Sequence, residues 1–124
     1  MTTITGLRTV GVPVTDQDRA LAFYTELGFE TRLDAPISET TRWIEIAPPG
    51  STSGLALVSG NEVAPGIDTG VRFSVASAEV EHRDMAAGGV AVGELLRWDG
   101  VPPMFTFTDP DGNTFYVVQE GSDV

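Results

Sequence analysis

The sequence has no cysteine, no lysine and a single histidine, His82, among its 124 residues. Without cysteine the chain offers no disulfide, no thiolate nucleophile and no thiolate metal ligand. Without lysine it forms no Schiff base with a carbonyl substrate and no phosphate-binding loop of the Walker type. A metal site that needs two imidazoles from one chain is excluded as well, and we expect His82 to be a solvated helix residue.

Basic residues and long apolar runs are also scarce. Seven arginines stand against 18 acidic residues, which gives a formal net charge of −11. Such a field repels nucleic acid and anionic membranes and attracts cations, although acidity can also serve solubility alone. No segment is long and apolar enough to span a bilayer, and the N-terminus has no signal-peptide pattern. We therefore expect a single-domain cytoplasmic protein without nucleic-acid or membrane partners.

The clearest local pattern is FTFTDPDGNTFYVVQ at residues 105–119. Its centre, DPDG, has the composition of a type I turn, because Asp bonds the backbone, Pro presets φ and Gly tolerates a positive φ. Apolar residues alternate with others on both sides of the turn, which is the period of a β-hairpin.

The remaining elements follow from periodicity and punctuation. Thr15 and Asp18 form a capping-box pattern that opens a helix, and Gly28 ends this helix. Ser77 caps a second helix that runs to about Ala87. The segments predicted as strands are 7–14, 29–33, Arg42–Ala47, Gly54–Val58, one beginning near residue 70, 90–95, Met104–Thr108 and Thr114–Gln119, and 35–41 is predicted as a loop.

The second half of the chain repeats the pattern of the first. A constant offset carries Val10 onto Val71 and Gly28 onto Gly89. The sequence therefore predicts an α+β fold of two βαβββ modules, at about 7–58 and 70–119, joined by a linker at 59–69.

Several motifs together resemble the glyoxalase / bleomycin resistance / extradiol dioxygenase superfamily, also called vicinal oxygen chelate proteins. They are VTD at 14–16, FY at 23–24, LGF at 27–29 and DPDGN at 109–113. The resemblance covers nearly the whole chain. It implies a curved mixed sheet around a cavity, with the helices on the outer face, and a homodimer. Because this superfamily hosts several chemistries, function has to be argued from the site.

Each predicted strand has one apolar face and one mixed face. A mixed face is often left to water. Large side chains on it favour a cavity instead, since extended apolar patches rarely face water. The residues expected to line this cavity are Trp43, Glu45, Arg72, Trp98, Met104 and Tyr116. The aromatic residues would stack on a ligand, and Glu45 and Arg72 would anchor it, unless the aromatics only pack and the charges are solvated or paired.

The resemblance also implies where a divalent metal would be bound. In the superfamily its ligands are His or Glu on the first and fourth strands of each module. These positions fall on Thr9, Ala56, Gly70 and Tyr116, none of which is a usual metal ligand. We therefore expect no metal and no other cofactor.

Two functions remain open at this point. The first is a metal-free binding protein for a small aromatic or cationic molecule, as in drug-sequestering members of the superfamily, which are acidic dimers. The second is a metal-independent lyase or isomerase-like enzyme. In that enzyme Glu45 would be the general base, its pKa raised by apolar neighbours, and Arg72 or Tyr116 would stabilise an oxyanion.

Overall fold

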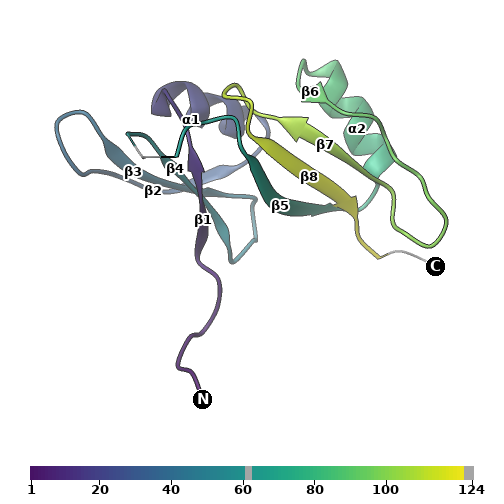
Figure 1. Ribbon diagram of the computed structural model, residues 1–124, viewed down its shortest axis with the longest axis horizontal. Helices are drawn as coiled ribbons and strands as arrows, with labels where there is room; N and C mark the ends of the chain where they lie inside the picture. Colours follow the sequence, from purple (N-terminus) through teal and green to yellow (C-terminus); the bar gives the residue numbers. More distant parts are fainter. Residues whose placement is uncertain (61–62, 122–124) are drawn as a thin grey trace. The chain divides into compact units, whose positions relative to one another are not determined.

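The computed structural model describes residues 1–60 and 63–121. The chain divides into two compact units, Met1–Pro65 and Gly66–Val124 (Figure 1). Residues 61 and 62 of the expected linker lie outside the described residues. Each unit has one helix and four strands in the order strand, helix, three strands, which confirms the predicted α+β fold of two βαβββ modules.

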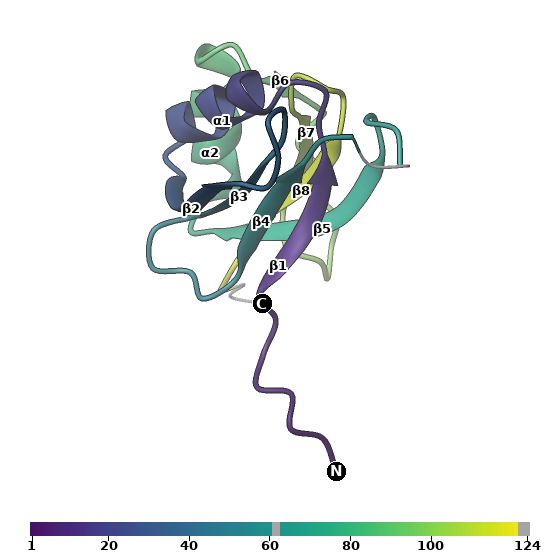
Figure 2. The same ribbon diagram turned by 90° about the vertical axis from the view of Figure 1, so that its left-hand side faces the viewer.

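The first unit contains β1 (Thr9–Pro13), α1 (Gln17–Glu26), β2 (Glu30–Pro36), β3 (Arg42–Ala47) and β4 (Gly54–Val58). Its strands form a sheet in the order β1-β4-β3-β2. The pair β1–β4 is parallel and the other pairs are antiparallel. Figure 2 shows α1 against one side of this sheet.

The second unit contains β5 (Asp68–Val75), α2 (Ala78–Ala87), β6 (Ala91–Val92), β7 (Met104–Thr108) and β8 (Thr114–Gln119). The strand order β5-β8-β7-β6 repeats that of the first unit, and the pair β5–β8 is again parallel. Neither of the described helices is long and apolar enough to cross a membrane.

The apolar faces predicted from the alternation form the cores of the two units. On the apolar face of the first sheet the buried residues are Val12, Ile44, Ile46, Leu55 and Leu57, and α1 adds Ala20 and Tyr24. In the second they are Phe105, Phe107, Phe115 and Val117, and α2 adds Ala78 and Met85. The mixed side of each sheet, which we call the polar face, points away from the helix.

Four local predictions were wrong. The first helix is capped by Asp16, whose carboxylate accepts from the Arg19 N–H, and not by Thr15. Strand β2 continues to Pro36, inside the segment predicted as a loop. Strand β5 begins at Asp68, two residues before the expected start. The segment 90–95 forms only the two-residue strand β6.

Strand β6 ends directly before Gly93, whose carbonyl oxygen is contacted by His82. His82 is half-buried rather than solvated, and its ring meets that of Phe105 edge-on at 5.0 Å. Its Nε2 lies 2.8 Å from the carbonyl oxygen of Gly93 and donates to it, since a carbonyl only accepts. A Cβ on Gly93 would lie 2.5 Å from the Thr106 hydroxyl, so a side chain here would require the Thr106 side chain to move.

The DPDG turn forms the predicted hydrogen bonds, and it also holds the segment before β5. Gly112 has a φ of 82°, and its N–H donates to the Asp109 carbonyl. The carboxylate of Asp109 accepts from the N–H groups of Asp111 and Asn113 and from the Asn113 side chain. Asn113 is fully buried, and its Oδ1 accepts from the N–H groups of Gly66 and Ile67. The turn therefore holds the segment that enters β5.

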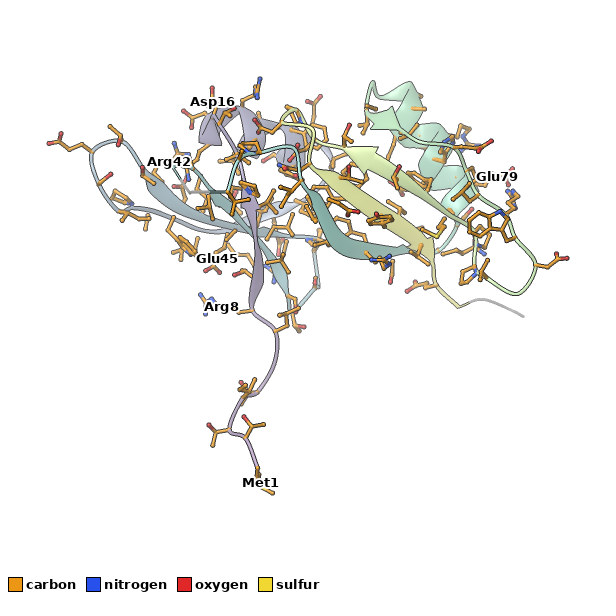
Figure 3. The ribbon with its side chains drawn as sticks, in the orientation of Figure 1. Met1, Arg8, Asp16, Arg42, Glu45 and Glu79 are labelled. Atoms are coloured by element: carbon orange, nitrogen blue, oxygen red, sulfur yellow. The ribbon has the colours of Figure 1, made fainter. Side chains whose placement is uncertain are left out.

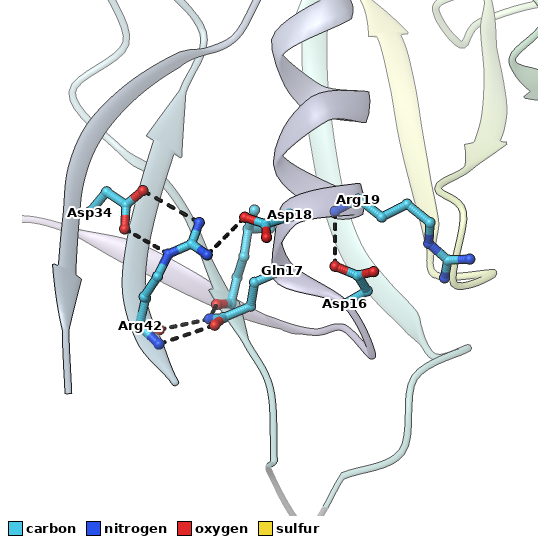
Figure 4. A network of polar contacts seen from close by, with 7 residues as sticks. Asp16, Gln17, Asp18, Arg19, Asp34 and Arg42 are labelled. Atoms are coloured by element: carbon cyan, nitrogen blue, oxygen red, sulfur yellow. Dashed lines mark hydrogen bonds and ion pairs between the residues drawn. The ribbon is translucent and has the colours of Figure 1, made fainter. Parts of the chain in front are cut away.

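Gln17 has a comparable role in the first unit (Figure 4). Its buried Nε2 donates to the carbonyls of Arg42 and Leu57 at 2.6 and 2.8 Å, and its Oε1 accepts from the Arg42 N–H at 3.1 Å. The guanidinium of Arg42 is paired with Asp34 and Asp18, which raises the pKa of Arg42 and keeps it charged. One side chain thus joins α1 to both central strands.

Gln17→Leu should therefore lower the free energy of unfolding by about 1–3 kcal/mol, because it leaves buried backbone groups without partners. Urea denaturation followed by circular dichroism measures this loss. Asp18→Asn is the matched control at the next residue, where the side chain is exposed, and it should change stability little. Equal losses for the two variants would contradict the proposed role of Gln17.

Candidate functional site

The polar face of the first unit is centred on Glu45. Strand register places Glu45 between Leu33 of β2 and Ala56 of β4, and Gly11 of β1 follows beyond Ala56. Glu45 alternates with the core residues Ile44 and Ile46, so its side chain points away from α1. Its position on the mixed face agrees with the alternation in the sequence.

Two donors hold the carboxylate of Glu45. The indole Nε1 of Trp43 donates to Oε2 at 2.8 Å, and Nε of Arg8 donates to the same oxygen at 3.2 Å. Glu45 is 8% exposed, whereas the Arg8 side chain is 77% exposed. Figure 3 labels Arg8 and Glu45 beside β1 and β3. A nearly buried anion is thus compensated by one aromatic and one cationic donor.

This arrangement overturns the expected pKa of Glu45. The hydrogen bond from Trp43 lowers it most; burial acts in the opposite direction, and Arg8 adds to the lowering. The net direction is downward from the ordinary value of 4.5. A carboxylate stabilised in this way is a weaker base, so the geometry disfavours Glu45 as a general base.

A cavity of about 270 Å³ opens next to Glu45 within the first unit. It is lined by Arg8, Thr9, Arg32, Leu33, Glu45, Ile46, Ala47, Thr52 and Gly54. Glu45 is the predicted site residue in this set, and neither arginine was predicted from the sequence. Only the position of Arg8, directly before Thr9 at a family metal position, could have indicated its place.

Arg32 belongs to the wall of this cavity and is held on several sides. It lies at the bulge of β2, between Thr31 and Leu33. Its guanidinium donates to the Glu30 carboxylate and to the backbone carbonyls of Pro48 and Ser51. Arg32 therefore fastens β2 to the turn between β3 and β4.

The polar face of the second unit has a second cluster, formed by Asp68, Arg72 and Tyr116. The Tyr116 hydroxyl donates to Asp68 Oδ2 at 2.7 Å. The guanidinium carbon of Arg72 lies 4.4 Å from the centroid of the Tyr116 ring, a cation–π contact. The hydrogen bond raises the pKa of Tyr116 and lowers that of Asp68. Asp68 was not among the predicted site residues.

The last two predicted residues, Met104 and Trp98, also lie in the second unit. Met104 begins β7 and is half-buried, with Val118 of β8 opposite it. Trp98 lies in the loop before β7 and is 61% exposed, as the loop signal in RWDGVPP predicts. Of the predicted residues, Trp43 is thus hydrogen-bonded to Glu45, and Arg72 stacks on Tyr116. Among the described contacts, neither Met104 nor Trp98 has a hydrogen bond to these pairs.

The positions at which superfamily members hold a metal do not fit one here. In the first unit Thr9 lines the cavity and Ala56 is a buried methyl group. In the second unit Gly70 has a φ of 69°, and the Tyr116 hydroxyl donates its hydrogen bond to Asp68. Within residues 1–60 and 63–121 no three His, Asp or Glu side chains are grouped as a metal site would require.

Trp43→Phe should raise the pKa of Glu45, because it removes the strongest bond to the carboxylate. Carbon-13 NMR of the Glu45 carboxyl measures the change, and Trp98→Phe should leave that pKa unchanged. Since folding lowers this pKa, the stability from Glu45 is complete above 4.5 and is lost as the pH falls through the lower folded value. Acid unfolding of Trp43→Phe should show less of this loss; an unchanged Glu45 titration would contradict the assignment.

Comparisons with known proteins agree with this architecture. The family model for the Glyoxalase/Bleomycin resistance protein/Dioxygenase superfamily matches residues 6–117. The uncharacterized protein YetH of Bacillus subtilis (strain 168) is 31% identical over 116 residues, which are 86% of this chain and 92% of YetH.

Solved structures give the same result. TnmS3, an antibiotic binding protein from Streptomyces sp. CB03234, is 29% identical with a TM-score of 0.86, over 96% of this chain and 98% of TnmS3. A superfamily member from Sphaerobacter thermophilus DSM 20745 is 28% identical with a TM-score of 0.89, over 96% of this chain and 100% of its own. With a family model that spans most of its length, the chain belongs to the Glyoxalase/Bleomycin resistance protein/Dioxygenase superfamily.

Proposed function

We propose that this protein binds a small aromatic molecule in the cavity of the first unit and does so without a metal. The observation that carries the proposal is the cavity itself. It places the exposed apolar side chain of Leu33 beside polar groups that their own contacts hold in place.

The fixed charges favour binding over catalysis. Oε2 of Glu45 accepts from Trp43 and Arg8, and the pKa of Glu45 is lowered. The proton of Tyr116 is committed to Asp68, which makes this phenol a poor donor to an oxyanion. The Glu45 carboxylate and the Tyr116 hydroxyl are thus held by internal hydrogen bonds and are poorly suited to proton transfer with a ligand.

The relatives support the same reading. TnmS3 is described as an antibiotic binding protein, and its fold matches this chain over nearly its whole length. An acidic chain whose metal positions are Thr9, Ala56, Gly70 and Tyr116 agrees with sequestration of a small molecule. The cationic alternative has less support, because the buried carboxylate of Glu45 already has two donors.

Filling the cavity should abolish binding. Native mass spectrometry of the protein with a library of small aromatic compounds should detect complexes of one compound per chain. Thr52→Phe, in the wall of the cavity, should lower the bound fraction of these compounds at least about tenfold, because a ring takes the place of the ligand. Thr40→Phe is the control in another exposed loop. Binding that survives Thr52→Phe would refute the assignment of the cavity.

We also propose that the protein is a metal-free homodimer. The same native spectra should show twice the 13.1 kDa chain mass and no divalent metal, even after expression in metal-supplemented medium. Compound binding should persist in EDTA, since no metal takes part in it. A dominant monomer at micromolar concentration would refute the dimer. Near one equivalent of zinc, nickel, iron or manganese per chain would refute the metal-free state.

A further inference from the structure

We propose that the molecule bound in the first-unit cavity carries an acidic group, a carboxylate or a phenolate, and that Arg8 binds this group. The inference rests on the proposed function and adds the chemical class of the ligand. It is the opposite of the preference for a cation that the net charge of −11 suggests.

Arg8 is fixed at one end and open at the other. Its backbone carbonyl accepts from the Gly54 N–H at 3.0 Å, which anchors the residue directly before β1. Its Nε donates to Glu45, which orients the guanidinium plane. Within the part of the chain that the structure describes, its two terminal nitrogens have no hydrogen-bond partner, and the side chain is mostly exposed. They form the planar fork that matches a carboxylate with two parallel bonds.

Glu45 does not offer a comparable site to a cation. Its Oε2 already accepts from Trp43 and Arg8, so a ligand cation at this oxygen would have to compete with both donors, and at Oε1 it would approach a carboxylate that Arg8 already compensates. Such a cation would also lie near Arg8 and Arg32, whose like charge disfavours it. The charged lining of the cavity is two arginines and one glutamate; Arg32 is paired with Glu30 outside the lining, and Arg8 with Glu45.

The charge of the whole chain does not outweigh these contacts. Exposed charges are largely screened beyond about 10 Å at 0.1 M salt, whereas the lining of the cavity is in contact with the ligand. Arg32 retains its place in the wall because Glu30 and two backbone carbonyls hold it. Arg8 is therefore the arginine that can turn its free nitrogens toward a ligand.

The size of the cavity limits the ligand to a small ring system. A volume of about 270 Å³ lies near the lower end of ligand pockets. The exposed side chain of Leu33 offers apolar surface for the ring, and Arg8 offers the fork for one acidic substituent. An aromatic acid meets both requirements.

Three probes of nearly equal shape test this. They are 2-naphthoate, 2-naphthamide and 2-naphthamidine, which are anionic, neutral and cationic. Calorimetric titration at 0.1 M salt should show 2-naphthoate binding at least about tenfold more tightly than the amide, as expected of a charge-assisted bond, and the amidine binding most weakly. Nitrogen-15 NMR should show the Trp43 indole signal, bonded to Glu45, shifting with 2-naphthoate.

Variants of Arg8 distinguish the contribution of its planar guanidinium from that of its positive charge. Arg8→Gln should remove the advantage of 2-naphthoate over 2-naphthamide. Arg8→Lys should restore only part of it, because an ammonium lacks the fork. Arg83→Gln is the matched control, since it removes an arginine of similar exposure, 72%, that does not line the cavity. It should leave all three affinities unchanged.

The outcomes distinguish this inference from the proposed function. The inference is wrong if 2-naphthamidine binds best and Glu45→Gln abolishes its binding, or if Arg8→Gln and Arg83→Gln act alike on 2-naphthoate. It is also wrong if none of the three probes binds. In each of these cases the library experiment with Thr52→Phe still decides separately whether the cavity binds small molecules.

Discussion

The parallel pairing of the first and last strands in each unit is the constraint on which the rest of the structure depends. Two parallel neighbours cannot be joined by a tight turn, so the chain has to cross over, and here the crossover begins with a helix. The helix buries its apolar stripe against one face of the sheet. The other face is left without a helix in both units, and the polar clusters form there. Gln17 and Asn113 fasten this arrangement, because each bonds to backbone groups of a distant strand or its entry segment.

The sequence predicted best where a side-chain period met a clear turn. The bounds of β3, β4, β7 and β8 agree with the alternation of their residues, and DPDG closes as its composition indicates. Prediction failed where a long-range partner decides the outcome. Strand β6 ends where the carbonyl of Gly93 accepts from His82 of α2, a partner far from any local pattern. The pKa of Glu45 is lowered by Arg8, 37 residues away, and by the orientation of the Trp43 indole, neither of which local patterns reveal.

In both units an aromatic side chain donates a hydrogen bond to a carboxylate on the polar face. In the first unit Glu45 accepts from the indole of Trp43, and in the second Asp68 accepts from the hydroxyl of Tyr116. An arginine stands beside each pair: Arg8 bonds to Glu45, and Arg72 stacks on Tyr116. In both clusters the pKa of the carboxyl is lowered chiefly by the aromatic donor. The likeness concerns chemistry and not strand position, because Tyr116 corresponds in register to Ala56.

Because of these contacts, the net charge of the chain does not predict the local charge on its polar faces. Each carboxylate accepts from an aromatic donor and lies next to an arginine. These neighbours compensate its charge at contact distance, so it attracts a cationic ligand only weakly. The arginine keeps the part of its guanidinium that faces outward. In the first unit this part is the terminal fork of Arg8, at the wall of the cavity. A chain with a net charge of −11 can therefore present a cation at the cavity of its first unit, because the nearest acid, Glu45, already accepts from Trp43 and Arg8.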